Sequence, residues 1–298
     1  MFGSETMRQQ IQYFNSEEAA KILNVNVSSI KRWTDNGKLS CIKTTGGHRK
    51  FTVQHLAEFL EKNKSLTSRI NLFPVETRKD LELSIHILKG NFAYLVDYVF
   101  HRAIECNRDE VQKVFNGLYM GQFPLYEIYD RLITPVLYKN GDYWESGQNS
   151  ITESHFVTQT IRDCLIRLQG IIRIPQEKTG TAFCLIMSSE LHDVAIKMVD
   201  HILEVKGHRV LFSGQMTPSI DIEKVYKLYN PQKVFISSTI VSDLNLQQAE
   251  FDKICNISQD YQTKVYVGGA GFNQLNLEHP AVAKRLFSYE SLCHDDSI

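Results

Sequence analysis

Ser188-Ser189-Glu190-Leu191-His192-Asp193-Val194-Ala195 is the stretch that decides the fold of the last third of the chain. It follows an apolar run, Ala182–Met187, and precedes a helical pattern, Val194–Val205. This order predicts a strand, a turn and a helix. Because ligands dock at the carboxyl ends of strands in open α/β sheets, we expect His192 to hold a large cofactor.

Strand and helix patterns alternate on both sides of this turn. The apolar runs are Thr181–Met187, Val210–Phe212, Val234–Ser238 and Val265–Val267, and the helical patterns between them are Val194–Val205, Ile222–Leu228 and Gln248–Ser258. Short apolar strands separated by helices predict a doubly wound parallel α/β domain of the Rossmann-like type over residues 180–298. We expect a further helix within 281–298 and a loose end in the last six residues.

The loops that follow the predicted strands meet at one edge of such a sheet. They carry Glu190-Leu191-His192, Gly214-Gln215, Ser237-Ser238-Thr239 and Gly268-Gly269. The hydroxyls can form hydrogen bonds, and the glycines admit a bulky group close to the backbone. A serine-hydrolase Gly-x-Ser-x-Gly and a dinucleotide-binding Gly-x-Gly-x-x-Gly are both missing from the expected places.

Composition indicates a cytoplasmic globular protein. The 298 residues are long enough for two or three domains, and hydrophobic residues make up 43%. No apolar run approaches the roughly 20 residues that span a bilayer, so we expect no membrane partner. Residues 1–15 lack the apolar core of a signal peptide. None of the six cysteines forms a Cys-x-x-Cys pair, which indicates buried thiols rather than a zinc site or disulfides.

Positive charge is concentrated near the start of the chain. Residues 8–64 contain ten Lys or Arg against five Asp or Glu, a net charge of +5. Because the whole chain has a formal net charge of −1, the remainder carries −6. A basic segment on an acidic body predicts a polyanionic partner.

This basic segment shows helix-turn-helix spacing. Ser16 is the expected cap of a first helix, and a second helix is predicted at Val27–Thr34, with Ile30 and Trp33 facing inward. Its expected outward residues are Ser28, Ser29, Lys31 and Arg32.

A hairpin around Gly46-Gly47 and a third helix, Val53–Lys62 with Thr52 as its cap, are expected to follow. The hairpin would direct Lys43, His48, Arg49 and Lys50 toward DNA.

Ala20-Lys21-Ile22-Leu23-Asn24-Val25, Ile30-Lys31-Arg32-Trp33 and Gly46-Gly47-His48-Arg49 resemble the winged helix-turn-helix of the MerR family. The resemblance implies a domain at 11–64 that binds double-stranded operator DNA; the alternative is a winged helix that binds protein. MerR proteins usually continue into a dimerising coiled coil. Residues 64–78 lack heptads and are predicted to form a linker, so dimerisation must come from elsewhere.

The middle of the chain, residues 78–175, is predicted to be a four-helix bundle. Apolar residues recur at helical intervals from Leu81 to Val99, from Val111 to Leu118, through Ile128 and Leu132 with Pro135 near the end, and from Ile151 to Leu168. Asp142–Gly147 would join the last two helices. On periodicity alone, Trp144 and His155 are as well explained by packing as by a binding site.

Three elements of the last third resemble a cobalamin-binding domain. Such domains carry Asp-x-His-x-x-Gly, Ser-x-Leu or Ser-x-Thr, and Gly-Gly, matched here by Glu190-x-His192-x-x-Ala195, Ser237-x-Thr239 and Gly268-Gly269. The resemblance implies that His192 is the lower axial ligand of cobalt and that Glu190 orients it. It also implies that Ser237 and Thr239 line a slot for the nucleotide tail, with Gly268 and Gly269 as its floor.

The order of the three domains is similar to that of the light-sensing, cobalamin-dependent MerR repressors of carotenoid genes. In that subfamily a bundle Trp, followed after nine residues by Glu-His, caps the upper face of the corrin, which implies the same role for Trp144 and His155. The resemblance implies adenosylcobalamin or methylcobalamin as cofactor, self-assembly into dimers or tetramers, and DNA release on illumination. This chain departs at Glu145, Ser154 and Ala195, where the subfamily has His, Glu and Gly.

Two other interpretations remain. A cofactor-independent regulator would use the α/β domain for oligomerisation, protein partners or another ligand, and the three departures favour it. Bundle and cobalamin domain also occur together in methyltransferases, but the chain offers no catalytic partner domain, so we do not expect an enzyme.

Overall fold

The computed structural model describes residues 13–63, 73, 77–188, 190–215 and 221–298. The chain divides into two compact units, Met1–Ile172 and Arg173–Ile298, which are described separately. Most of the predicted linker at 64–78 lies outside the described residues. In the described ranges, no helix combines the length and the apolarity needed to cross a membrane.

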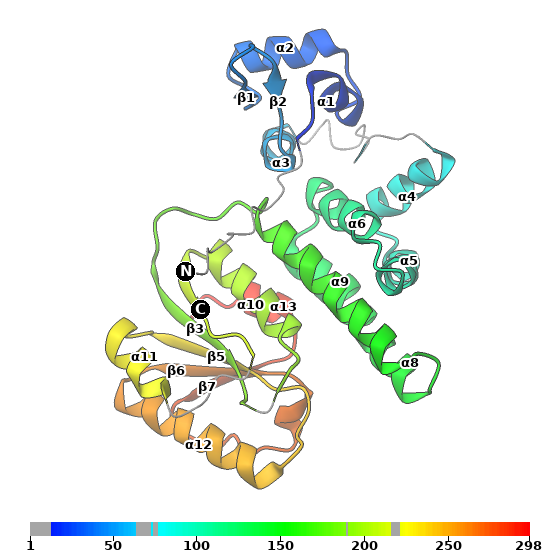
Figure 1. The fold of residues 1–298 in the computed structure, drawn as a ribbon. Helices are drawn as coiled ribbons and strands as arrows, with labels where there is room; N and C mark the ends of the chain where they lie inside the picture. Colours follow the sequence, from blue (N-terminus) through cyan, green and yellow to red (C-terminus); the bar gives the residue numbers. More distant parts are fainter. Residues whose placement is uncertain (1–12, 64–72, 74–76, 189, 216–220) are drawn as a thin grey trace, which may run out of the picture. The chain divides into compact units, whose positions relative to one another are not determined.

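The first unit begins with the predicted winged helix-turn-helix. Its elements are α1 (Ser16–Ile22), α2 (Val27–Asp35), β1 (Ile42–Lys43), β2 (Arg49–Lys50) and α3 (Val53–Lys62) (Figure 1). The predicted cap of α1 was wrong by one residue. The side chain of Asn15 accepts from the backbone N–H groups of Glu17 and Glu18, and the Glu18 carboxylate accepts from the Asn15 N–H at 2.7 Å. This reciprocal pair satisfies N–H groups that a helix start leaves open.

The bundle contains more helices than predicted. They are α4 (Arg78–Leu88), α5 (Phe92–Ile104), α6 (Arg108–Met120), α7 (Leu125–Ile128), α8 (Thr134–Glu145) and α9 (Ile151–Gln169), with a π-helical turn, η2 (Tyr129–Ile133), joining α7 to α8. The single helix expected from Leu81 to Val99 is two, because Gly90 has a left-handed φ of 60° and Asn91 caps α5. Apolar periodicity continues across this break and therefore hides it.

Pro135 lies near the start of α8, not near the end of a helix as predicted. A proline within a helix lacks an N–H donor and clashes with the carbonyl group four residues earlier. The π turn directly before it changes the local spacing, and helix continues to Glu145. Consequently Trp144 belongs to the last turn of α8, whereas the sequence placed it in a loop.

The second unit is the predicted doubly wound parallel sheet. Its strands are β3 (Gly180–Ile186), β4 (His208–Phe212), β5 (Lys233–Ser237), β6 (Lys264–Gly268) and β7 (Val282–Leu286), in the order β4-β3-β5-β6-β7. Helices α10 (Val194–Val205) and α13 (Tyr289–Cys293) cover one face, and α11 (Ile222–Tyr229) and α12 (Leu244–Asp260) cover the other (Figure 1). Strand β4 lies on one side of β3 and strand β5 lies on the other, so the order in which strands are added reverses at β3. The loops after β3 and β5 therefore form the topological switch point of this parallel sheet.

The end of the chain differs from its prediction. Residues 281–298 contain the edge strand β7 as well as the short helix α13, and the last six residues are not loose. Lys206 donates to the carbonyl oxygens of Cys293 and Asp295, Lys284 pairs with Asp295 at 2.6 Å, and Ile298 is buried. The β7 sequence Val-Ala-Lys-Arg-Leu lacks the continuous apolar run of a central strand because β7 has only one neighbour.

Candidate functional site

The Glu190 side chain joins the two loops of the switch point. One carboxylate oxygen, Oε1, accepts from the backbone N–H groups of Leu191 and His192, both at 3.0 Å, and contacts Nδ1 of His192. The other, Oε2, accepts from the N–H groups of Thr239 and Ile240 at 2.7 and 2.9 Å. Glu190 is only 2% exposed. The sequence placed these loops together, and the structure shows that a single buried carboxylate connects them.

These contacts lower the pKa of Glu190 and raise the pKa of His192. Burial by itself would raise the pKa of Glu190, but hydrogen bonds from the His192 ring and from the backbone N–H groups of Ile240, His192 and Thr239 lower it to about 2. The hydrogen bond to Glu190 raises the pKa of His192, against the opposing effect of partial burial. The carboxylate is therefore ionised at neutral pH and holds the Nδ1 side of the imidazole.

His192 presents its other ring nitrogen away from this carboxylate. Its side chain is 52% exposed, and within the described residues Nε2 has no hydrogen-bond partner. The large apolar side chains of Leu191, Ile240 and Leu244, on the same two loops and at the start of α12, are exposed as well. An imidazole fixed by a carboxylate is the usual arrangement of a metal-binding histidine, so the donor set fits a cobalt ligand.

The Ser237-Ser238-Thr239 loop packs closely against the turn after β6. Ser237 and Ser238 are buried, whereas Thr239 is exposed. Gly269 has a φ of +104°, and a Cβ on it would lie 2.1 Å from the Ser238 carbonyl oxygen; a Cβ on Gly271 would lie 2.3 Å from Ser238 Oγ. Gly271 was missed by the sequence analysis, although it follows the Gly-Gly pair by two residues. Ser238 was placed in a site loop, and its hydroxyl is buried without a hydrogen-bond partner among the described residues.

We expect Gly269→Ala to destabilise the fold by about 3 kcal/mol or more, because a β-carbon would both disfavour the positive φ and collide with backbone. Gly268→Ala is the matched control, since its added carbon would meet only the Leu286 carbonyl oxygen at 3.5 Å. Urea unfolding of both variants measures the difference. Equal losses would show that the close approach at Ser238 does not restrict residue 269.

We expect His192→Ala to destabilise the ligand-free chain more at about pH 5.5 than at about pH 8.5. Because the His192 pKa is raised, its pairing contributes fully below the ordinary value of 6.5 and is lost as pH rises through the folded-state value. The lowered Glu190 pKa keeps the carboxylate's contribution above its ordinary value of 4.5, and that contribution is lost as pH falls toward 2. Urea unfolding at the two pH values tests this, with His279→Ala as control; a pH-independent loss would contradict it.

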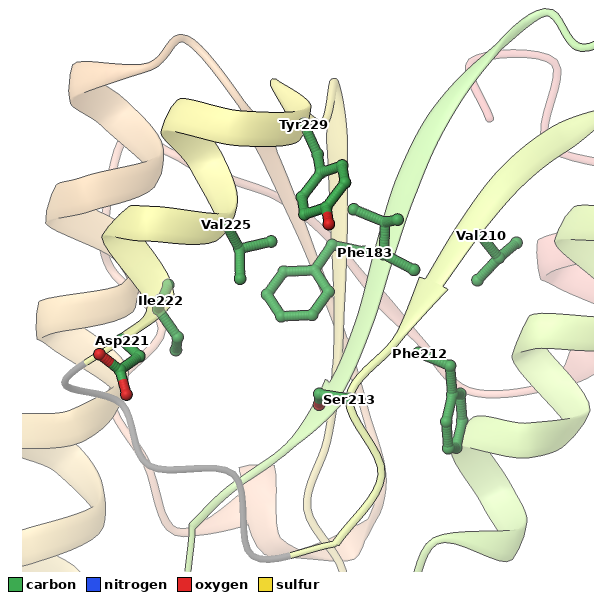
Figure 2. Close-up of a pocket in the computed structure, with 9 residues that line it drawn as sticks. Phe183, Val210, Phe212, Ser213, Asp221, Ile222, Val225 and Tyr229 are labelled. Carbon is green, nitrogen blue, oxygen red and sulfur yellow. The ribbon is translucent and has the colours of Figure 1, made fainter. Parts of the chain in front are cut away.

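A cavity of about 380 Å³ lies elsewhere in this unit, between α11 and the sheet. In Figure 2, Val225 and Tyr229 of α11 face Phe183 of β3 across it. None of its lining residues is a predicted site residue. The candidate site is therefore placed at the Glu190–His192 turn, where polar groups from two loops converge.

Gln215, from the loop after β4, also reaches this turn and donates to the Leu191 carbonyl oxygen at 2.7 Å.

The two bundle residues predicted to contact a cofactor lie at one end of the α8–α9 hairpin. Trp144 is in the last turn of α8 and is 47% exposed, and His155 is exposed in the second turn of α9. Glu145 is also exposed. Ser154 is tied to α8, because its hydroxyl and carbonyl oxygens accept from Nδ2 of the buried Asn140 at 2.9 and 3.1 Å.

Most of the predicted DNA-contacting side chains are exposed. They are Ser28, Lys31, Arg32, Lys43, His48 and Lys50, while Ser29 is partly covered. Arg49 differs, because its guanidinium pairs with Asp35 at 2.6 Å and its side chain is only 20% exposed. Asp35 is the last residue of α2, so this ion pair joins the hairpin to the second helix.

Comparisons with known proteins identify two domains within the first unit and a similarity that extends over most of the chain. A helix-turn-helix domain matches residues 13–64, and a B12 binding domain matches residues 95–169, from α5 to α9. The HTH-type transcriptional repressor CarH of Myxococcus xanthus is 22% identical over 283 residues, covering 90% of this chain and 91% of that protein. The solved structure of the Methanosarcina barkeri monomethylamine corrinoid protein has the same fold over 67% of this chain and 96% of its own, with a TM-score of 0.56 and 12% identity. The chain therefore combines a helix-turn-helix domain with a B12 binding domain, and over most of its length it is similar to a transcriptional repressor.

Proposed function

We propose that this regulator binds operator DNA through its winged helix-turn-helix and that a cobalamin-type ligand at His192 controls this binding. One observation carries the proposal: the buried Glu190 carboxylate fixes the His192 imidazole at the switch point of the sheet and leaves Nε2 outward. When bound, a cobalamin would supply a cobalt ion that can exchange a ligand.

Different residues of the chain would bind different parts of the ligand. Glu190 would orient His192, whose Nε2 would coordinate cobalt, and the exposed Leu191, Ile240 and Leu244 would offer an apolar surface to the corrin. Ser237 and Thr239, with Gly268 and Gly269, are proposed to hold the nucleotide tail. Trp144 and His155 are proposed to contact the upper face of the same ligand, a role carried over from the resemblance to the light-sensing repressors.

Self-assembly would convert ligand binding into a change in DNA affinity. A single winged helix contacts DNA weakly, and joining several in one assembly raises the effective affinity by roughly 10²–10⁴-fold. We propose that the ligand-loaded chain forms dimers or tetramers that occupy the operator, and that illumination reverses this assembly.

The test uses adenosylcobalamin and the full chain, kept in the dark. Visible spectra after desalting measure retention, gel filtration measures size, and gel shifts with a duplex selected by the protein from random DNA measure binding, each before and after green light. We expect retained colour, a larger species in the dark and weaker DNA binding after light. A colourless protein would refute the cofactor, and colour with unchanged size and DNA affinity would refute the switch.

A cofactor-independent regulator is the second candidate, and the contact at one of the three departures favours it. The Ser154 hydroxyl accepts from Nδ2 of Asn140, so this side chain is already engaged within the bundle. This candidate predicts selection of a specific DNA duplex by a chain that retains no adenosylcobalamin.

A further inference from the structure

Helix α12 holds the loop that leads to His192. The Glu250 carboxylate, on the second turn of α12, accepts from the Ser188 backbone N–H at 3.1 and 3.2 Å and from the Ser188 hydroxyl at 3.0 Å. Ser188 comes directly after Met187 at the end of the β3 run and two residues before Glu190. A contact between residues 62 positions apart therefore fixes the start of the site turn.

The Glu250 carboxylate is buried without a cationic partner among the described residues. Its residue is only 9% exposed. Burial of a carboxylate without a cation is costly unless hydrogen-bond donors compensate for the lost water. Here the Ser188 N–H and hydroxyl are the donors, so the geometry of the Ser188 loop and the burial of Glu250 depend on each other.

The same helix also holds the second loop of the site. Gln247, one turn before Glu250 and 1% exposed, donates from Nε2 to the Ile240 carbonyl oxygen at 3.2 Å. The Ile240 N–H in turn donates to Glu190. Helix α12, Ser188, Glu190 and Ile240 thus form a closed ring of contacts, which we name the α12 clamp.

We propose that Glu250 is a positioning residue for the cobalt ligand: through the α12 clamp it holds Glu190, and hence His192, in the orientation that binds. This inference rests on the proposed function of His192. A loop ordered before binding does not have to lose conformational freedom when the ligand arrives, so clamp contacts favour binding without touching the ligand. Residues that hydrogen-bond to a metal ligand typically change metal affinity by about 10–100-fold when replaced. Because Glu250 acts through Ser188, we expect its replacement to have an effect at the low end of this range.

The test compares Glu250→Ala and Glu250→Gln with a matched control on the same helix, Ser258→Ala. The buried Ser258 hydroxyl contacts Tyr226 and the Ile254 carbonyl oxygen, remote in sequence from both site loops, so its loss destabilises α12 packing without removing a clamp contact. Affinity for adenosylcobalamin is measured by equilibrium dialysis. Coordination is measured from the nitrogen splitting in the electron paramagnetic resonance spectrum of bound cob(II)alamin, with ¹⁵N-histidine-labelled protein.

Glu250→Ala should bind adenosylcobalamin about tenfold more weakly and show less protein-nitrogen coordination. Glu250→Gln should keep most of both, because its amide oxygen can still accept from the Ser188 N–H. Ser258→Ala should bind adenosylcobalamin as tightly as the wild-type chain, even if its melting temperature falls as much as that of Glu250→Ala. Wild-type affinity and coordination in Glu250→Ala, or an equal loss in Ser258→Ala, would overturn the inference.

Hydrogen–deuterium exchange of the ligand-free chain separates this inference from the proposed function. Glu250→Ala should speed exchange in peptides covering the Ser188 and Ile240 loops, and Ser258→Ala should not. If the wild-type chain binds no cobalamin, the proposed function fails, but the exchange experiment still tests the α12 clamp. Unchanged protection of both loops in Glu250→Ala would show that Glu250 does not hold them.

Discussion

His192→Ala should retain adenosylcobalamin at least about tenfold less tightly than the wild-type chain and should lose all protein-nitrogen coordination to bound cob(II)alamin. The reason is geometric: His192 is the residue whose ring nitrogen points away from a fixed carboxylate partner, on loops that also expose Leu191 and Ile240. Equilibrium dialysis and the nitrogen splitting described above provide the two measurements. His279→Ala is the control, because His279 belongs to the same unit but contacts Asn256 instead.

The Glu190→Gln variant tests the orientation of His192 by Glu190 separately from the coordination of cobalt by His192. The carboxylate accepts from donors on both of its oxygens, whereas glutamine has one acceptor oxygen and would direct an NH₂ group at N–H donors on the other side. We expect a loss of about 1–3 kcal/mol in unfolding free energy and weaker ligand retention, with nitrogen coordination still detectable because His192 remains. Unchanged retention in Glu190→Gln would show that the pairing is structural only.

The spacing of apolar residues in the sequence was sufficient to predict helices whose apolar face continues without interruption. Val194–Val205 was predicted with the bounds that α10 has, because an apolar face continues without interruption between a turn and a glycine. The break at Gly90 and the passage of the helix through Pro135 were not predictable in this way. Each depends on backbone geometry, a left-handed φ and a π turn, that leaves the apolar periodicity unchanged.

The candidate site was predictable to the level of loops but not of contacts. Parallel strands bring the residues after β3 and β5 to one edge, so the proximity of Glu190 to Thr239 follows from topology. Which donors the carboxylate accepts from, and the participation of Glu250, depend on side-chain packing across 49 to 62 residues of chain. A carboxylate on an amphipathic helix such as α12 would ordinarily be assigned to the solvent side, which is why the sequence did not indicate Glu250.

The pairing of Arg49 with Asp35 affects how a DNA-binding experiment on the β1–β2 hairpin, the wing of this domain, is interpreted. Sequence alone assigned Arg49 to phosphate contact, but the structure holds its guanidinium against the carboxylate at the end of α2. Two explanations for a weak Arg49→Ala variant then compete. Arg49 either contacts a phosphate or only braces the hairpin against α2, and the salt dependence of binding distinguishes them.

We expect Arg49→Ala to weaken binding to every DNA sequence and to reduce the slope of log K against log salt by about 0.9, the value for one lost phosphate contact. Asp35→Asn should leave that slope unchanged, because Arg49 keeps its charge. Since the Asp35 carboxylate is 56% exposed, the ion pair contributes only about 0–1 kcal/mol to the fold. Fluorescence anisotropy between about 50 and 200 mM salt measures both slopes, with Lys62→Ala on α3 as a charge-matched control. If Asp35→Asn instead weakened binding as much as Arg49→Ala, and neither variant changed the slope, bracing of the wing would be the role of Arg49.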